Sequence, residues 1–395
     1  MPGGNYVRLK DLGWEVLQKK KMKNLFLLAV LIFSSLNLSG QDAERKDTLS
    51  LIFIGDIMGH DPQIESAFNP EKGEYNYDGV FRKVSHIIKA ADFAIANLEV
   101  TLAGEPYAGY PQFSSPDALA VACKKNGIDV LVTANNHSCD RAKKGLLRTI
   151  HVLDSLEIPH TGTFKDSTER NSNNLLVLDK NNIRVGLLNY TYGTNGLPTP
   201  SPTMVNRIDT LTMLSDIRKS AADSLDKLIV MIHWGPEYQS QPSKKQVEIA
   251  EVLFRNGVDI IVGSHPHVLQ KMEYFKATEE DNEHFIAYSL GNFVSNQRTR
   301  KRDGGAMLKL TLCKNKEDVQ ISNSGYYLTW VSRPVIDGKT MYEIVPCSQF
   351  ESNDFYDLDS DSKEKMKVFM ADSRALFEKE NIAVLEIKAK SNKNK

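Results

Sequence analysis

Short apolar runs rich in β-branched residues alternate with helix-length amphipathic stretches along most of this 395-residue chain. The strand-like runs are residues 51–55, 92–96, 129–133, 228–232 and 258–262. The stretches with helical periodicity are residues 80–90, 117–126, 143–156, 209–225 and 243–256. This alternation predicts an α/β core whose strands are largely buried.

Two features interrupt the simple alternation. Residues 175–179 and 183–190 flank Lys180-Asn181-Asn182, a pattern typical of a β-hairpin. Residues 285–290 and 306–313 add further strand-like runs late in the chain. The sequence therefore predicts one mixed sheet or two sheets.

A cluster of polar residues follows each strand-like run. The clusters are Gly55-Asp56 with His60, Asn97-Leu98-Glu99, Asn135-Asn136-His137, His233-Trp234-Gly235 with Glu237, and Gly263-Ser264-His265-Pro266-His267. In open α/β sheets the loops beyond the carboxyl ends of the strands border one crevice. We therefore expect these five clusters to be neighbours in space.

Five of the nine histidines lie in these clusters, together with carboxylates and a side-chain amide. Such donors suit Mn, Fe, Zn or Co better than calcium. The number of donors exceeds what one ion needs, which favours two divalent ions about 3.5 to 4 Å apart that share a carboxylate. The alternative is that each histidine separately caps a loop or completes a buried network. Their succession at strand ends favours the metal site.

Six sequence blocks resemble the bacterial CapA family, the capsule or poly-gamma-glutamate synthesis proteins. The blocks, in order, are Gly55-Asp56-Ile57-Met58, Asn97-Leu98-Glu99, Ala134-Asn135-Asn136-His137, His233-Trp234-Gly235-Pro236-Glu237-Tyr238, Gly263-Ser264-His265-Pro266-His267 and Ser289-Leu290-Gly291-Asn292-Phe293. The resemblance runs from about residue 50 to residue 294. Together the blocks are highly specific, whereas any one alone is weak.

That family is similar to the calcineurin-like metallophosphoesterases, which implies an α/β fold with two mixed β-sheets packed as a sandwich and flanked by helices. The metal ligands that it implies are Asp56, Glu99, Asn136, His233, His265 and His267. Glu99 would bridge two ions, with Asp56 and His267 on the first ion and the remaining three residues on the second. Met58 stands where the superfamily has a histidine, so His60 is a displaced substitute, and Glu99 replaces an aspartate.

The implied chemistry is hydrolysis of a phosphoester, or handling of an anionic cell-envelope polymer or its precursor. Two cations would lower the pKa of a shared water and offset negative charge on the substrate. His137 would donate a proton, and Glu237 and Tyr238 would orient His233 or contact substrate. The alternative function is a non-catalytic accessory protein that binds polymer or membrane polymer-synthase subunits.

The amino end has the order of a secretory signal. Lys19, Lys20, Lys21 and Lys23 precede an apolar run at residues 25–33, and small residues follow near Gly40. We therefore expect residues 1–40 to be a leader and signal peptide, with Met22 as an alternative start, and the protein to be exported. A single uncleaved membrane anchor is the alternative. Export would permit disulfides among the four cysteines, but their spacing favours small buried residues with at most one bridge.

The rest of the chain divides into residues 48–300 as the family-like domain, 301–350 as additional strands, and 351–395 as an acidic segment, a helix over residues 362–380 and a polar tail. Lys plus Arg is 49 and Asp plus Glu is 50, a formal net charge of −1, which argues against a nucleic-acid partner. A basic run at residues 297–302 is either simply solvated or borders the predicted site, where it would attract an anion.

Overall fold

Strand β1 (Asp47–Ile57) lies inside the larger of two β-sheets in the computed structural model, which describes residues 47–279, 281–316, 318–353 and 358–388. Among these residues the sheet follows the order β20 (Glu343–Pro346), β17 (Asp318–Ser332), β16 (Gly304–Asn315), β1, β4 (Phe93–Leu98), β5 (Val130–Val132) and β6 (His160–Thr161), with β15 (Asn292–Val294) paired to β1 and β21 (Leu385–Glu386) paired to β17. Strands β1, β4, β5 and β6 are parallel, whereas β16, β17 and β20 are antiparallel. The sheet is therefore mixed.

The second sheet is also mixed. In the described residues its order is β13 (Met272–Phe275), β14 (His284–Ala287), β12 (Ile260–Ser264), β11 (Lys227–His233), β9 (Ile183–Thr191) and β8 (Leu176–Lys180). The four inner strands are parallel and the two outer pairs are antiparallel. Each predicted strand-like run lies in or overlaps one of these strands.

The two sheets pack face to face. Leu51 and Phe53 of β1 belong to the same buried cluster as Ile229 of β11 and Val262 of β12. Successive strand residues point to opposite faces, so the neighbouring residues of β1 pack instead against the helices outside the sheet. The predicted sandwich of two mixed sheets flanked by helices is confirmed.

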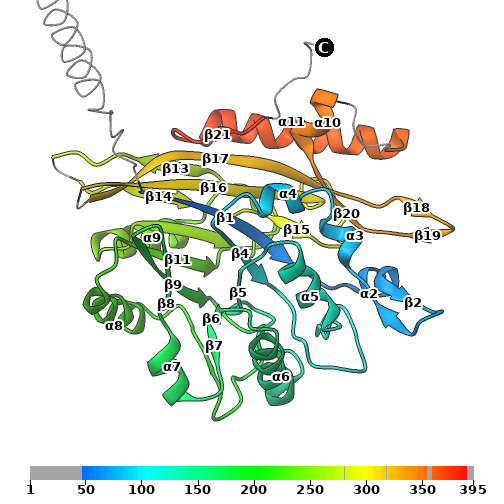
Figure 1. Ribbon diagram of the computed structural model, residues 1–395, viewed down its shortest axis with the longest axis horizontal. Helices are drawn as coiled ribbons and strands as arrows, with labels where there is room; N and C mark the ends of the chain where they lie inside the picture. The colour runs from blue at the N-terminus through cyan, green and yellow to red at the C-terminus, as the bar shows by residue number, and fades with distance from the viewer. Residues whose placement is uncertain (1–46, 280, 317, 354–357, 389–395) are drawn as a thin grey trace, which may run out of the picture. The chain divides into compact units, whose positions relative to one another are not determined.

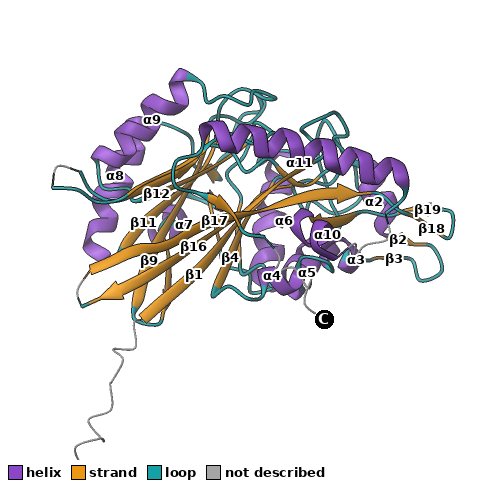
Figure 2. Cartoon of the chain, turned by 90° about the horizontal axis from the view of Figure 1, so that it is seen from above, coloured by secondary structure: helices purple, strands orange, loops and turns teal. Residues whose placement is uncertain are grey.

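Helices cover the outer faces of the sandwich (Figures 1 and 2). The described helices are α2 (Asp61–Ala67), α3 (Asp78–Phe81), α4 (Ser85–Ile88), α5 (Ala118–Lys125), α6 (Ala142–Ser155), α7 (Ser167–Asn173), α8 (Thr210–Ser220), α9 (Lys244–Arg255), α10 (Cys347–Asn353) and α11 (Ser360–Glu380). The remaining short elements are a 3₁₀ turn (Ala221–Asp223) and the strand pairs β2 (Phe68–Asn69) with β3 (Glu74–Tyr75), β7 (Thr163–Phe164) with β10 (Met204–Val205), and β18 (Val335–Ile336) with β19 (Lys339–Thr340). Helices α8 and α9 pack on the outer face of the second sheet.

Local sequence signals explain several of these boundaries. Asn181 and Asn182 both have positive φ (55° and 59°), which is the conformation that the two-residue turn of the predicted hairpin between β8 and β9 requires. The Ser243 side chain accepts a hydrogen bond from Gln246 N–H at the start of α9, and Asp359 accepts one from Ser362 N–H at the start of α11. Asp359 therefore caps helix α11.

Two helix predictions were too long. The stretch 80–90 forms the separate helices α3 and α4, because Val84 N–H bonds to the carbonyl of Phe81, three residues back, and tightens the chain between them. The stretch 209–225 ends as an α-helix at Ser220, and Ser224 then takes a left-handed conformation (φ 51°).

The carboxyl-terminal part of the chain is tied to the first sheet. Strand β16 pairs with β1 along eight residues, from Asp47 to Ile54, although some 250 residues separate the two strands in sequence. Helix α11 runs along β17 (Figures 1 and 2), and its Met366 and Phe369 join the cluster between the sheets. The described residues from Asp47 onward form one compact unit.

The four cysteines, Cys123, Cys139, Cys313 and Cys347, are buried free thiols. Within the described residues, no helix combines the length and apolar character that crossing a membrane requires. The predicted leader and its apolar run lie in residues 1–46, outside the described residues.

Replacing Phe369 by alanine tests the packing of α11 on the sheet. Phe369 is 2% exposed, and its ring lies so close to Gly304 of β16 that a Cβ there would be 2.7 Å from it. We expect Phe369→Ala to lower the free energy of unfolding by about 3–5 kcal/mol, because it leaves a cavity. Val368 on the same helix is 43% exposed, so Val368→Ala should change the free energy of unfolding by less than about 0.5 kcal/mol. Urea denaturation measures both, and equal effects would contradict the packing.

Candidate metal centre

Side chains at the carboxyl ends of strands from both sheets meet at one place. Asp56 lies in β1, Glu99 follows β4, and His233 is the last residue of β11. Asn97 Nδ2 donates a hydrogen bond to Asp56 Oδ1 at 2.8 Å and lies 3.3 Å from His233 Nδ1. The predicted convergence of these clusters is confirmed, and it joins the two sheets.

A close approach of two backbones fixes the position of Asp56. Its N–H donates a hydrogen bond to the carbonyl of Gly291 at 3.1 Å. A Cβ on Gly55 would lie 2.2 Å from that carbonyl oxygen, so only glycine fits there. Backbone packing therefore requires the glycine at position 55, and the predicted metal site requires the aspartate at position 56.

Two groups of buried side chains can each hold a metal ion. One consists of Glu99, His265 and His267, and the other of Asp56, Glu99 and His233; in each, one donor atom per residue lies within 4.8 Å of the others. Glu99 belongs to both groups, the position of a bridging ligand. The family resemblance implied different groups, with His265 beside His233 and His267 beside Asp56. The second of these expected pairs is also close in space, since His267 Nδ1 lies 3.2 Å from Asp56 Oδ2.

Some of the donor atoms in these groups have no hydrogen-bond partner in the protein. Both carboxylate oxygens of Glu99 and Nδ1 of His265 are buried without a hydrogen bond. Burial, reinforced by repulsion from Asp56, raises the pKa of Glu99 well above its ordinary value. Burial and the neighbouring His267 lower the pKa of His265 to about 4. Unpaired buried acceptors of this kind are costly, and a divalent cation with nitrogen and oxygen ligands would satisfy them.

Hydrogen bonds fix the direction of two of the imidazoles. His233 Nδ1 lies 2.9 Å from Ser264 Oγ, and His267 Nδ1 lies 3.0 Å from Asn292 Oδ1. The Nε2 atoms then face Glu99 Oε1, at 3.5 Å for His233 and 3.8 Å for His267. Partners on the far nitrogen orient a metal-binding histidine and set its tautomer.

The turn after β12 carries its two histidines in unusual backbone conformations. His265 has φ 98° and His267 has φ 56°, values that are costly for residues other than glycine. The Tyr192 ring, which follows β9, packs on His265 with ring centroids 4.5 Å apart. Backbone strain at a buried histidine pair is typical of a functional site.

Asn136 and His137 reach the site from the loop after β5. Asn136 Oδ1 lies 2.8 Å from His233 Nε2, so the amide is within reach of the same centre. His137 Nδ1–H donates to Asp140 Oδ2 at 2.8 Å, and the same oxygen accepts the Phe113 N–H at 2.7 Å. His137 is thus held through one nitrogen while Nε2 remains for other partners.

Like Asn136 and His137, the predicted site residues His60 and Glu237 lie outside both metal groups. His60 Nδ1 contacts Gln63 Oε1 at 3.0 Å and the Asn296 N–H at 3.3 Å, and the residue caps α2. Glu237 is exposed. Neither group of potential ligands includes His60, so its role as a displaced ligand stays a prediction.

Three residues that support the site had no assigned role in the sequence prediction. Asp140 is marked by its position three residues after His137, a spacing that could have indicated the pair. Ser264 and Asn292 lie inside the family-like blocks, but nothing in their local sequence indicates which histidine each contacts. Trp234, directly after β11, is buried and donates its ring N–H to the Tyr288 carbonyl, so it packs as part of the protein interior.

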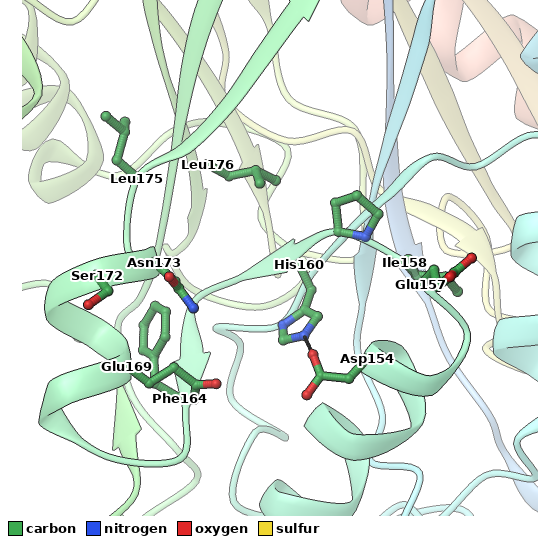
Figure 3. Close-up of a pocket in the computed structure, with 11 residues that line it drawn as sticks. Asp154, Glu157, Ile158, His160, Phe164, Glu169, Ser172, Asn173, Leu175 and Leu176 are labelled. Atoms are coloured by element: carbon green, nitrogen blue, oxygen red, sulfur yellow. Dashed lines mark hydrogen bonds and ion pairs between the residues drawn. The ribbon is translucent and has the colours of Figure 1, made fainter. Parts of the chain in front are cut away.

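A pocket of about 470 Å³ lies elsewhere, between α6, α7 and β8 (Figure 3). Its lining includes Asp154, Phe164, Glu169 and Leu176 and shares no residue with the two metal groups. In this pocket His160 Nε2 lies 3.1 Å from Asp154 Oδ1. These two residues form a second histidine–aspartate pair, and neither is a candidate metal ligand.

The profile of the bacterial capsule synthesis protein family PGA_cap matches residues 50–297. The chain belongs to this family. It is 29% identical over 326 residues to the capsule biosynthesis protein CapA of Bacillus anthracis, covering 76% of this chain and 75% of that protein. It is 30% identical over 289 residues to the PGA biosynthesis protein CapA of Bacillus subtilis (strain 168), covering 68% and 69%.

Solved structures with a similar arrangement include the NAD nucleotidase of Haemophilus influenzae, with a TM-score of 0.48 and 14% identity over 87% of this chain and 58% of that one. The calcineurin-like phosphoesterase YfkN from Bacillus subtilis matches with a TM-score of 0.41 and 12% identity over 83% of this chain and 98% of that one.

Glu99→Gln tests whether the shared carboxylate binds metal. The substitution keeps the shape of the side chain but removes the charge and one oxygen donor, so we expect metal affinity to fall at least 10-fold. Metal content after dialysis against Mn or Zn measures this. Without metal, the Glu99→Gln protein should be at least as stable to heat as the wild type, because a buried charge is lost.

The matched control is Glu237→Gln, which removes a carboxylate near the site but outside both groups. It should retain wild-type metal content. Equal metal binding by the wild type and Glu99→Gln would remove Glu99 from the ligand set.

Proposed function

We propose that this protein is a metal-dependent phosphoester hydrolase of capsule biosynthesis. The observation that carries the proposal is the Glu99 carboxylate, shared by two groups of potential ligands, with both oxygens buried and unpartnered. Hydrolases that use two metal ions place a shared ligand in this position. Carboxylate, imidazole and amide donors fit Mn, Fe, Zn or Co.

The residues around the candidate ligands prepare the site for such chemistry. Divalent ions, when bound, supply positive charge that offsets negative charge on a phosphoryl oxygen and lower the pKa of water. Asn97, Ser264 and Asn292 hold Asp56 and the histidines in fixed directions. The acidic and imidazole ligands are each at most 3% exposed, and the low exposure to bulk water strengthens the electrostatic interactions at the centre.

His137 is the proton donor to the leaving group in this proposal. Its Nδ1–H is held by Asp140, which leaves Nε2 to carry and release the proton. A histidine in a fixed direction beside a carboxylate is the usual arrangement for a general acid or base. Asp140 is a positioning residue here because it acts through His137.

The substrate that we propose is an anionic cell-envelope polymer, such as poly-gamma-glutamate, or a phosphorylated precursor of it. The two CapA relatives are named for capsule biosynthesis and PGA biosynthesis, which supports this class. We further propose that the protein is exported and acts beside membrane polymer-synthase subunits. The basic and apolar order of residues 19–40 supports export.

His137→Ala and Asp140→Asn test the proposed chemistry. The purified protein with added Mn is assayed on phosphomonoesters and phosphodiesters. We expect His137→Ala to lower kcat about 10²- to 10⁴-fold, the size of a general-acid contribution. Asp140→Asn should lower it about 10- to 100-fold. Both variants should retain bound metal, since neither residue belongs to the two metal groups.

Asp154→Asn is the matched control, because Asp154 contacts His160 as Asp140 contacts His137 but lines the separate pocket. Its kcat should equal that of the wild type. Failure of the wild type to hydrolyse any phosphoester while it binds polymer would establish the alternative function, a non-catalytic accessory protein.

A further inference from the structure

An arginine stacked on a tyrosine lies beside the candidate metal centre. The Arg302 guanidinium carbon is 3.3 Å from the centroid of the Tyr238 ring. The Tyr238 ring in turn lies 6.1 Å, centroid to centroid, from the ring of the candidate ligand His267. Tyr238 is 39% exposed, whereas His267 is 2% exposed. The stack therefore lies between the buried centre and solvent.

The backbone around the stack is tied to the same residues that shape the centre. Tyr238 N–H donates to the Pro266 carbonyl at 2.8 Å, within the turn that carries both candidate histidines. Asn292 Nδ2 donates to the Arg302 carbonyl at 2.8 Å, while Asn292 Oδ1 contacts His267 Nδ1. One asparagine thus fixes the arginine loop and a candidate metal ligand at once.

The other arginines of the basic run have structural partners. Arg298 donates to the Val331 carbonyl at 2.9 Å and lies over the Trp330 ring. Arg300 makes two hydrogen bonds of 2.6 Å to Asp372 of α11. Within the described part of the chain, the Arg302 guanidinium makes no hydrogen bond or ion pair. Stacking covers its face and leaves the N–H groups on its edge available.

Two carboxylates adjoin the stacked pair in sequence, and both are directed elsewhere: Asp303, next to Arg302, accepts the Trp330 ring N–H, and Glu237, next to Tyr238, lies by the tyrosine hydroxyl. Burial and the Glu237 carboxylate beside the hydroxyl raise the pKa of Tyr238 to about 12. Glu237 therefore acts at the hydroxyl, and Arg302 lies over the ring face. A guanidinium held flat with its edge free has the geometry for two parallel hydrogen bonds to a carboxylate or phosphate.

We infer that Arg302, held by Tyr238, binds a second anionic group of the substrate next to the one that reacts at the metal centre. This inference rests on the proposed function and specifies its substrate class: a phosphoester that carries a further carboxylate or phosphate, as the repeating unit of an anionic polymer does. Arg302 is a specificity-determining residue, and it takes no part in the bond-breaking step.

Matched aryl phosphates test the inference. Phenyl phosphate carries only the reacting group, 4-carboxyphenyl phosphate adds a carboxylate, and 1,4-phenylene bisphosphate adds a phosphate. We expect Arg302→Ala to raise KM for the two compounds with a second anionic group about 10- to 100-fold, the effect of one charge-assisted hydrogen-bonded pair. Its kcat, and its KM for phenyl phosphate, should stay at wild-type values. The compound that loses more affinity identifies the preferred anion.

Arg302→Lys and Arg300→Ala are the control variants. Arg302→Lys keeps the charge but lacks the planar fork, so it should restore only part of the loss. Arg300→Ala removes the same charge from the same run, but from the pair with Asp372, so its KM values should match the wild type. Equal losses in Arg300→Ala and Arg302→Ala would overturn the inference in favour of a general effect of charge.

Equilibrium binding separates this inference from the proposed function. Titration calorimetry of the Mn-loaded protein measures the affinity for 4-carboxyphenylphosphonate and phenylphosphonate, which resist hydrolysis. Wild-type preference for 4-carboxyphenylphosphonate, lost in Arg302→Ala, supports the inference even if no substrate is hydrolysed. Hydrolysis by the wild type with the same preference in Arg302→Ala would leave the proposed function intact and overturn the role of Arg302.

Discussion

The buried carboxylate of Glu99 is the constraint on which the site depends. Neither of its oxygens has a hydrogen-bond partner, and the residue is fully enclosed by protein. Removing a charge from water costs several kcal/mol per ion unless a partner compensates. The nearest groups are neutral imidazoles and the second carboxylate, Asp56, which adds repulsion. In the folded protein this cost appears as the raised pKa of Glu99, and a bound cation would offset it.

The two-sheet architecture explains how such a group is held. Asp56 and Glu99 belong to the first sheet, whereas His233 and the histidine turn belong to the second. Their distances therefore depend on how the two sheets pack, and the cluster between the sheets fixes that packing. The late strand β16 pairs with β1 along eight residues and so stiffens the strand that carries Asp56. A substitution in this cluster could alter the metal site without contacting it.

The sequence predicted those features that depend on turn chemistry and on the general geometry of strands. The hairpin at Asn181-Asn182 and the convergence of polar clusters follow from turn chemistry and from the geometry of parallel strands. The assignment of each strand to one of two sheets did not follow, because the pairing of β1 with β16 is a contact between distant segments that no periodicity records. The same limit applies to the site. The types of donor were predictable, whereas the pairing of Asn292 with His267 depends on the packed structure.

The charge of the donor set determines how the site would treat an anionic substrate. The candidate ligands contain two carboxylates, Asp56 and Glu99, and otherwise neutral imidazoles and an amide, so their formal charge is −2 when both are ionised. One divalent ion would bring the centre to zero, and two would bring it to +2. Only the second case attracts an anion by itself, since field strength at a buried site follows the net charge. With one ion, the contact between Arg302 and the second anionic group would supply a larger share of the substrate binding, so the number of bound ions determines how strongly that binding depends on Arg302.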